Sequence, residues 1–112
     1  MEQNLPFTPE QIKRLAPIYY TVKEAEKVFA TENTSFEWMA ALVDGVIKSE
    51  FADTEMQLTM LSASMVITTM RSAYMTAKKA EHKQAIQEVA KEEVKDIVMT
   101  ALYLAAARAV KV

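Results

Sequence analysis

The chain has 112 residues, of which 51% are hydrophobic and 25% are charged, and its formal net charge is −2. This length fits one domain with one buried core, and the composition is that of a folded globular protein rather than a disordered chain. A slightly acidic chain has no long-range attraction for phosphate backbones, which disfavours nucleic acid as a partner. No cysteine is present, so disulfides and thiolate chemistry are excluded.

Signals for targeting and for phosphate binding have no match in the sequence. The first residues lack the basic segment and apolar run of a signal peptide, and no uncharged stretch reaches the roughly 20 residues that a membrane helix needs. We therefore expect a cytoplasmic protein that does not enter a membrane. With a single glycine, the chain cannot contain a glycine-rich phosphate loop.

A first helix is predicted to begin after Thr8. Thr8 can cap the helix, Pro9 suits its first position, and Gln11 has the spacing of a capping box. Apolar residues then recur on one helical face. They are Ile12, Leu15, Tyr19, Val22 and Phe29. Because Pro17 lacks a backbone donor and clashes with the preceding turn, we expect a kink or a break near Ala16.

A second helix is predicted after a polar loop at residues 31–35. Thr34 and Glu37 have the spacing of another capping box. Apolar positions at helical spacing follow and predict a helix through about Glu50. They are Met39, Leu42, Val43, Val46, Ile47 and Phe51.

The C-terminal half predicts two long helices. Either Asp53 or Thr54 can cap the first. Its apolar residues step by four and three, which is typical of a helix packed along another helix. They are Met56, Met60, Ala63, Ile67, Met70, Tyr74 and Ala77. After an interruption at residues 78–84 a second series follows, namely Ile86, Ala90, Val94, Ile97, Ala101 and Leu104. We expect a turn at residues 78–84, since without one a single helix would run about 85 Å.

These elements predict an all-α fold. It is a small helical bundle with a kinked N-terminal helix, a second helix and a long C-terminal antiparallel helical hairpin, and residues 1–112 form a single helical domain. In the hairpin, the uncharged residues 56–70 lie beside residues 92–106, and the charged residues gather at a solvated tip, residues 71–91.

Both helices of the hairpin carry a second apolar stripe. On the last helix it lies nearly opposite the first stripe, and on the preceding helix it lies away from the seam of Met60 and Ile67. The residues are Met99, Tyr103, Ala106 and Val110, and Leu58, Leu61 and Met65. A helix that is apolar on two sides is central or shared between molecules, so we predict that these residues form a homo-oligomer interface. A monomeric four-helix bundle with an alanine-rich seam is the alternative.

Only one acidic pair suggests metal chemistry. Glu93 and Asp96 form an E-x-x-D on the last helix, and carboxylates three residues apart can share a Mg²⁺ ion. This stretch resembles one helix of the all-helical, MazG-like nucleotide pyrophosphatases, which implies a Mg²⁺-dependent nucleotide hydrolase. Those enzymes also carry an E-x-x-E on an earlier helix, which this sequence lacks. The only histidine, His82, lies in the expected turn without a partner that would tune it for catalysis.

Two further motifs fit poorly. Ala41, Gly45 and Phe51 have the spacing of a helix-turn-helix, but the helix that would approach DNA begins with carboxylates, which phosphates repel. Residues 44–55 are rich in carboxylates, but Val46 and Lys48 occupy the positions of ligands in a calcium loop.

We therefore expect a non-enzymatic interaction protein, such as an adaptor, inhibitor, chaperone or small regulator, that self-associates and needs no cofactor or metal. The protein partner is unknown, and its binding surface is either the tip at residues 71–91 or the aromatic side chains of Tyr20 and Trp38. The alternative is a small-molecule or nucleotide-binding protein, with Glu93 and Asp96 as metal ligands.

Overall fold

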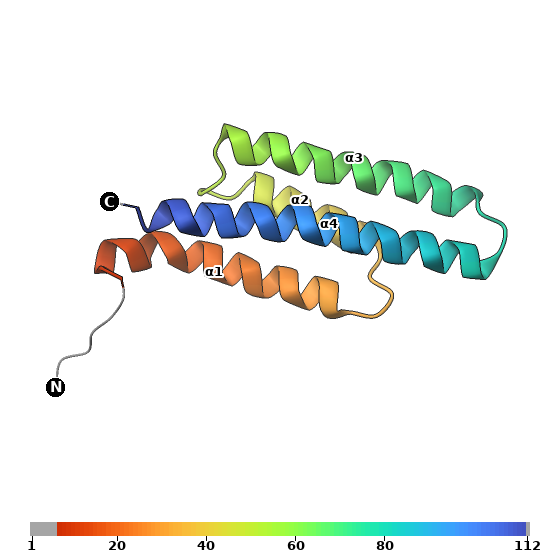
Figure 1. Cartoon of the computed structure of the whole chain (residues 1–112), viewed down its shortest axis with the longest axis horizontal. Helices are drawn as coiled ribbons and strands as arrows, with labels where there is room; N and C mark the ends of the chain where they lie inside the picture. The colour runs from red at the N-terminus through yellow and green to blue at the C-terminus, as the bar shows by residue number, and fades with distance from the viewer. Residues whose placement is uncertain (1–6, 112) are drawn as a thin grey trace.

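The computed structural model describes residues 7–111, and within them the chain forms four helices and no strand (Figure 1). The helices are α1 (Pro9–Ala30), α2 (Phe36–Ile47), α3 (Thr54–Thr76) and α4 (Ala80–Ala109). The predicted all-α bundle is confirmed. The expectation that the first residues carry no targeting signal concerns residues 1–6, which lie outside the described part of the chain.

The bundle is flat, with α4 at its centre. Figure 1 shows α4 between α1 and α3, with α2 behind it, and the Cα atoms extend over 62 × 31 × 16 Å. Because α2 is short and lies on one side only, the opposite broad face of α4 is covered by no further helix of the described chain. None of the helices in residues 7–111 combines the length and the apolar character needed to cross a membrane.

The buried face of α4 differs from the predicted one. Seven of its residues are buried, namely Ala90, Val94, Val98, Ala101, Leu102, Ala105 and Ala109. Ala90, Val94 and Ala101 were expected from the periodicity, but Leu104, expected in the same stripe, is 51% exposed. The correction has a packing cause, since α1, α2 and α3 surround α4 on three sides and centre its buried face on Val98 and Leu102.

The start of α1 matches the prediction. The Gln11 N–H donates to Thr8 Oγ1 at 3.2 Å, and the Thr8 N–H donates to Gln11 Oε1 at 2.8 Å, which completes the capping box. The helix does not end at Pro17, so the alternative of a break there is wrong. The Thr21 hydroxyl donates to the Pro17 carbonyl at 2.8 Å.

The start of α2 corrects the prediction by one residue. Ser35 is the N-cap and accepts a hydrogen bond from the Trp38 N–H at 3.1 Å. Thr34 is buried instead, and its hydroxyl lies 2.6 Å from the Val28 carbonyl and 2.7 Å from the Thr31 carbonyl. Carbonyls near the end of a helix lack intrahelical donors, so the end of α1 engages this hydroxyl. The helix also stops at Ile47 rather than near Glu50.

The predicted hairpin is present, with a shorter turn. Asp53 caps α3 by accepting the Met56 N–H at 2.8 Å. Only residues 77–79 separate α3 from α4, so the single long helix is wrong. His82 lies in the first turn of α4 rather than in the connection. The Lys83 ammonium donates to the Tyr74 carbonyl at 2.7 Å, which ties the two helices together at the tip.

Candidate interaction surface

Large apolar side chains line the outer side of α3. Leu58, Leu61, Met65 and Met75 are 61%, 52%, 70% and 68% exposed. We call these four residues the α3 ridge. Leu58, Leu61 and Met65 lie on the side of the helix opposite its buried residues, which are Met56, Met60, Ala63 and Ile67. Met75, near the end of the helix, borders a cavity between α2 and α3.

The α3 ridge has the spacing of a coiled-coil seam. Alternating steps of three and four residues from Leu58 lead to Leu61, Met65, Thr68, Ser72 and Met75. These are the a and d positions of one heptad register, which face a partner helix in coiled coils. All large apolar side chains that α3 exposes fall on this register. The pattern therefore indicates a helix with two packing sides, one of them unoccupied within the described chain.

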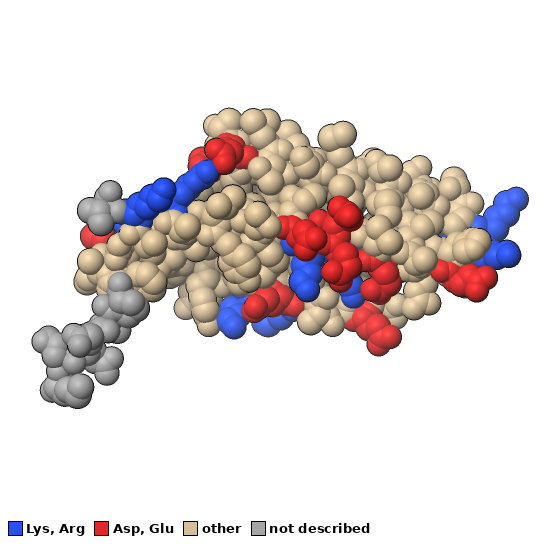
Figure 2. Space-filling model, viewed as in Figure 1, with Lys and Arg blue, Asp and Glu red and all other residues tan. Residues whose placement is uncertain are grey.

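The uncharged surface continues from α3 onto α4. No charged residue occurs at positions 56–70 or 97–107, and the hairpin places these stretches side by side. Leu104 is 51% exposed on this part of α4, whereas Tyr103, which is 58% exposed, borders α1. Figure 2 shows a broad uncharged area over the N-terminal half of α3 and the C-terminal half of α4, with charged residues at its borders. The exposed apolar side chains Leu58, Leu61 and Met65 lie within these uncharged stretches.

An ion cluster closes one end of this surface. Arg108 donates to Asp53 at 2.9 Å and to Glu55 at 2.7 Å. The hydrogen bond and the charge of Glu55, followed by the charge of Asp53, raise the pKa of Arg108. Arg108 thus remains charged at every physiological pH, and it links the start of α3 to the end of α4.

The second predicted stripe, on α4, faces α1 for most of its length. Met99, Ala106 and Val110 are half-buried, and Tyr103 is the exposed member. Met99 and Tyr103 line a cavity of about 250 Å³ that α1 closes, and the Gln11 side-chain amide donates to the Val110 carbonyl at 2.6 Å. The structure therefore does not bring the two predicted stripes together on one surface.

The other candidate partner surfaces lie elsewhere. Tyr20 and Trp38 are both exposed, and Tyr20 borders a cavity between α1 and α2. At the tip, Arg71 lies 3.5 Å from Glu37 of α2. In the rest of the segment 71–91, Lys78, Lys79 and Glu81 are exposed, whereas Lys83, Glu88 and Lys91 are half-buried.

The candidate chemical residues are solvated. Glu93 and Asp96 are exposed on α4, and His82 is exposed near its start. Within residues 7–111, no group of three or more histidine, aspartate or glutamate side chains is placed to hold a metal ion. Gly45 lies inside α2, although a helix-turn-helix would place this glycine in its turn.

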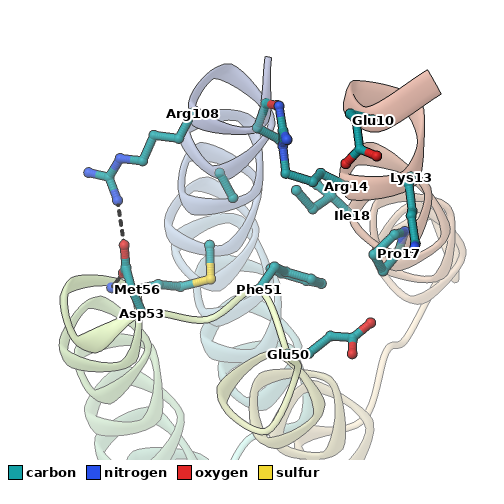
Figure 3. A pocket seen from close by; sticks show the side chains of 12 residues that line it. Glu10, Lys13, Arg14, Pro17, Ile18, Glu50, Phe51, Asp53, Met56 and Arg108 are labelled. Carbon is teal, nitrogen blue, oxygen red and sulfur yellow. Dashed lines mark hydrogen bonds and ion pairs between the residues drawn. The ribbon is translucent and has the colours of Figure 1, made fainter. Parts of the chain in front are cut away.

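Sequence reasoning missed two features. The first is Met75, which lies ten residues beyond Met65 on the same heptad register. The two register positions between them are the polar residues Thr68 and Ser72, so the apolar pattern is interrupted there. The second feature is a cavity of about 600 Å³ at the end of the bundle where α1 begins and α4 ends (Figure 3).

Comparison of the chain with protein-family models, curated proteins and solved structures finds no match.

Proposed function

We propose that the protein is a non-enzymatic interaction protein that self-associates through the α3 ridge. The observation that carries this proposal is the single heptad register of Leu58, Leu61, Met65 and Met75 on the solvent side of α3. A heptad seam exposed to water is unfavourable unless another helix covers it. Adaptors, inhibitors and small regulators of this size act through such helix-to-helix contacts.

A second copy of the chain fits the charges around the α3 ridge. In an antiparallel pair centred at the height of Ala63, Leu61 is level with Met65 of the second copy, and Glu55 is level with Arg71 of the second copy. Unlike charges then lie at both ends of the uncharged contact, each of them already paired within its own copy, Glu55 with Arg108 and Arg71 with Glu37. In a parallel pair, Glu55 would instead lie at the same height as Glu55 of the second copy, and Arg71 at the same height as its Arg71. This proximity of like charges is unfavourable. We therefore propose the antiparallel arrangement.

The expected affinity is moderate. Full burial of a leucine or methionine side chain contributes about 1.5–3 kcal/mol, and the ridge side chains are already partly covered, so each contributes roughly 1–2 kcal/mol. Leu58, Leu61 and Met65 of both copies lie within this contact, and these six side chains must offset an association cost of about 4–15 kcal/mol. A dissociation constant near the micromolar range needs a net gain of about 8 kcal/mol, so it is the tightest binding that this contact supports. Tyr103 and Leu104 would add to this contact if the second copy extends over α4.

Substitution of two central ridge residues tests the proposal. Sedimentation equilibrium between 1 and 300 μM should give a dimer of the 12.6 kDa chain at the upper end. Leu61→Lys with Met65→Lys should weaken association by about a hundredfold or more, because two ammonium groups per copy would be buried in an apolar contact. Far-UV circular dichroism should remain unchanged, since both side chains are exposed.

Tyr20→Lys with Trp38→Lys is the matched control. It also exchanges two exposed apolar side chains for lysine, but away from the α3 ridge. Association of this variant should equal that of the unmodified chain. A protein that stays monomeric at 300 μM would overturn the proposal, as would a control variant that dissociates as strongly as the ridge variant.

A further inference from the structure

We propose that the cavity at the end of the bundle binds an organic anion that has one carboxylate and an apolar body, such as a medium-chain fatty acid. This proposal is independent of self-association, because the cavity and the α3 ridge share no residue. The cavity has a volume of about 600 Å³, within the range of about 300–1,000 Å³ that is typical of small-molecule sites.

Three separate segments build the cavity. The first turns of α1, the connection between α2 and α3, and the last turns of α4 meet there. Figure 3 shows the Arg14 side chain reaching from α1 towards α4, and the Phe51 ring pointing into the space between them. Ile18, Met56 and Ala109 are buried and form an apolar floor. A hydrocarbon chain on this floor and against Phe51 would leave water, which favours binding.

Two cationic side chains, those of Arg14 and Lys13, line the same cavity as this apolar floor. The Arg14 Nε donates to the Ala109 carbonyl at 2.9 Å, which orients the guanidinium and leaves its terminal N–H groups for a ligand. Lys13 lines the same cavity. Within residues 7–111, no carboxylate oxygen lies within 4.0 Å of the side-chain nitrogens of Lys13 or Arg14. Guanidinium groups bind carboxylates with paired hydrogen bonds, so Arg14 can anchor the head of the ligand.

The other charges of the cavity limit the ligand to a single negative charge. Arg108 is paired with Asp53 and Glu55, so it offers little to a ligand. Glu10 and Glu50 also line the cavity and offset the charges of Lys13 and Arg14. The charged side chains that line the cavity sum to zero, so one carboxylate at Arg14 brings the total to −1. A phosphate ester or a polyanion would bring more negative charge and would be repelled more strongly by Glu10 and Glu50.

Methionine methyl groups can report the site directly. In protein labelled with ¹³C at the methionine methyls, decanoate below its micelle concentration should shift the Met56 signal in a saturable way. The signals of Met65 and Met75 should not move, because these residues lie on the α3 ridge. Decyltrimethylammonium, which has the same chain with the opposite charge, should bind at least about tenfold more weakly. Acetate, which lacks the chain, should produce no shift.

Two variants test the two halves of the site. Arg14→Gln should weaken decanoate binding by about tenfold or more, whereas Lys27→Gln, a charge change at the far end of α1, should have no effect. Ala105→Leu fills the cavity from α4 and should abolish binding, whereas Ala85→Leu on the exposed start of α4 should not. Circular dichroism and thermal unfolding check that each variant is folded.

Three results would overturn the proposal. The first is no saturable Met56 shift with decanoate. The second is equal binding of decanoate and the ammonium compound, which would show partition of the chain alone. The third is a shift confined to Met65 and Met75, which would place the amphiphile on the α3 ridge. None of these results bears on the dimer, whose test uses no ligand.

Discussion

Replacement of Leu102 by alanine is expected to lower the free energy of unfolding by about 2–5 kcal/mol. Leu102 of α4 is fully buried, and it belongs to the core cluster that residues of all four helices form. The substitution removes apolar contacts and leaves a cavity that the neighbouring helices fill only in part. Because domains of this size are stable by only about 5–15 kcal/mol, this change is a large fraction of the total.

Leu104 provides the matched control, two residues further along the same helix. It is 51% exposed, so Leu104→Ala should change the free energy of unfolding by less than about 0.5 kcal/mol. Urea unfolding followed by circular dichroism, at a protein concentration too low for association, measures both variants. Equal losses for the two leucines would mean that the buried face of α4 is centred on the stripe that the sequence predicted, rather than on Leu102.

The two leucines also show why the periodicity of α4 was insufficient. The sequence correctly indicated a helix with apolar residues on two sides, but the choice of the inner side depends on how many helices surround it. Three neighbours widen the buried face of α4 until it includes Val98 and Leu102. The sequence does not directly show how many helices pack around α4. On α3, which is at the edge of the bundle, the predicted seam of Met56, Met60 and Ile67 is buried as expected.

Local signals were reliable where the interaction is itself local. The caps formed by Thr8 and Asp53 involve residues at most three positions away, and both were predictable. Thr34 was the exception, since its hydroxyl bonds carbonyls only six and three positions before it and yet it is not the cap of α2. Gln87 of α4 also donates to the Thr34 carbonyl, at 2.6 Å. A contact across more than fifty positions of the chain is a consequence of the fold, so no local pattern contains it.

The α3 ridge and the cavity also differ in how far the sequence predicted them. Leu58, Leu61 and Met65 were identified because an apolar stripe that faces away from a seam is visible in one helix. The cavity was not identified from the sequence, because its floor combines Ile18, Met56 and Ala109 from three distant segments. Each of these residues has an ordinary place in its own helical pattern, and only the bundle brings them together. Sequence patterns can therefore indicate a one-helix surface, whereas a site at a junction of helices requires the structure.

Val43→Asp is expected to cost about 4 kcal/mol or more and to unfold the whole chain rather than α2 alone. Val43 is 1% exposed on the inner face of α2, where a carboxylate would be buried without a partner. The buried residues of α2 belong to the same core cluster as those of α1, α3 and α4, so loss of α2 would expose that core. Ala40→Asp introduces the same carboxylate at an exposed position of α2 and should change the stability little.

The pH dependence of Val43→Asp separates charge burial from a simple loss of packing. Burial raises the pKa of the introduced carboxyl in the folded state, so the folded protein binds the proton more tightly than the unfolded chain does. Its destabilisation relative to the unmodified chain should therefore shrink as the pH falls from 7 towards 4, when both are followed by urea unfolding. A destabilisation that is independent of pH would mean that position 43 is hydrated, and that α2 does not close the rear of the core.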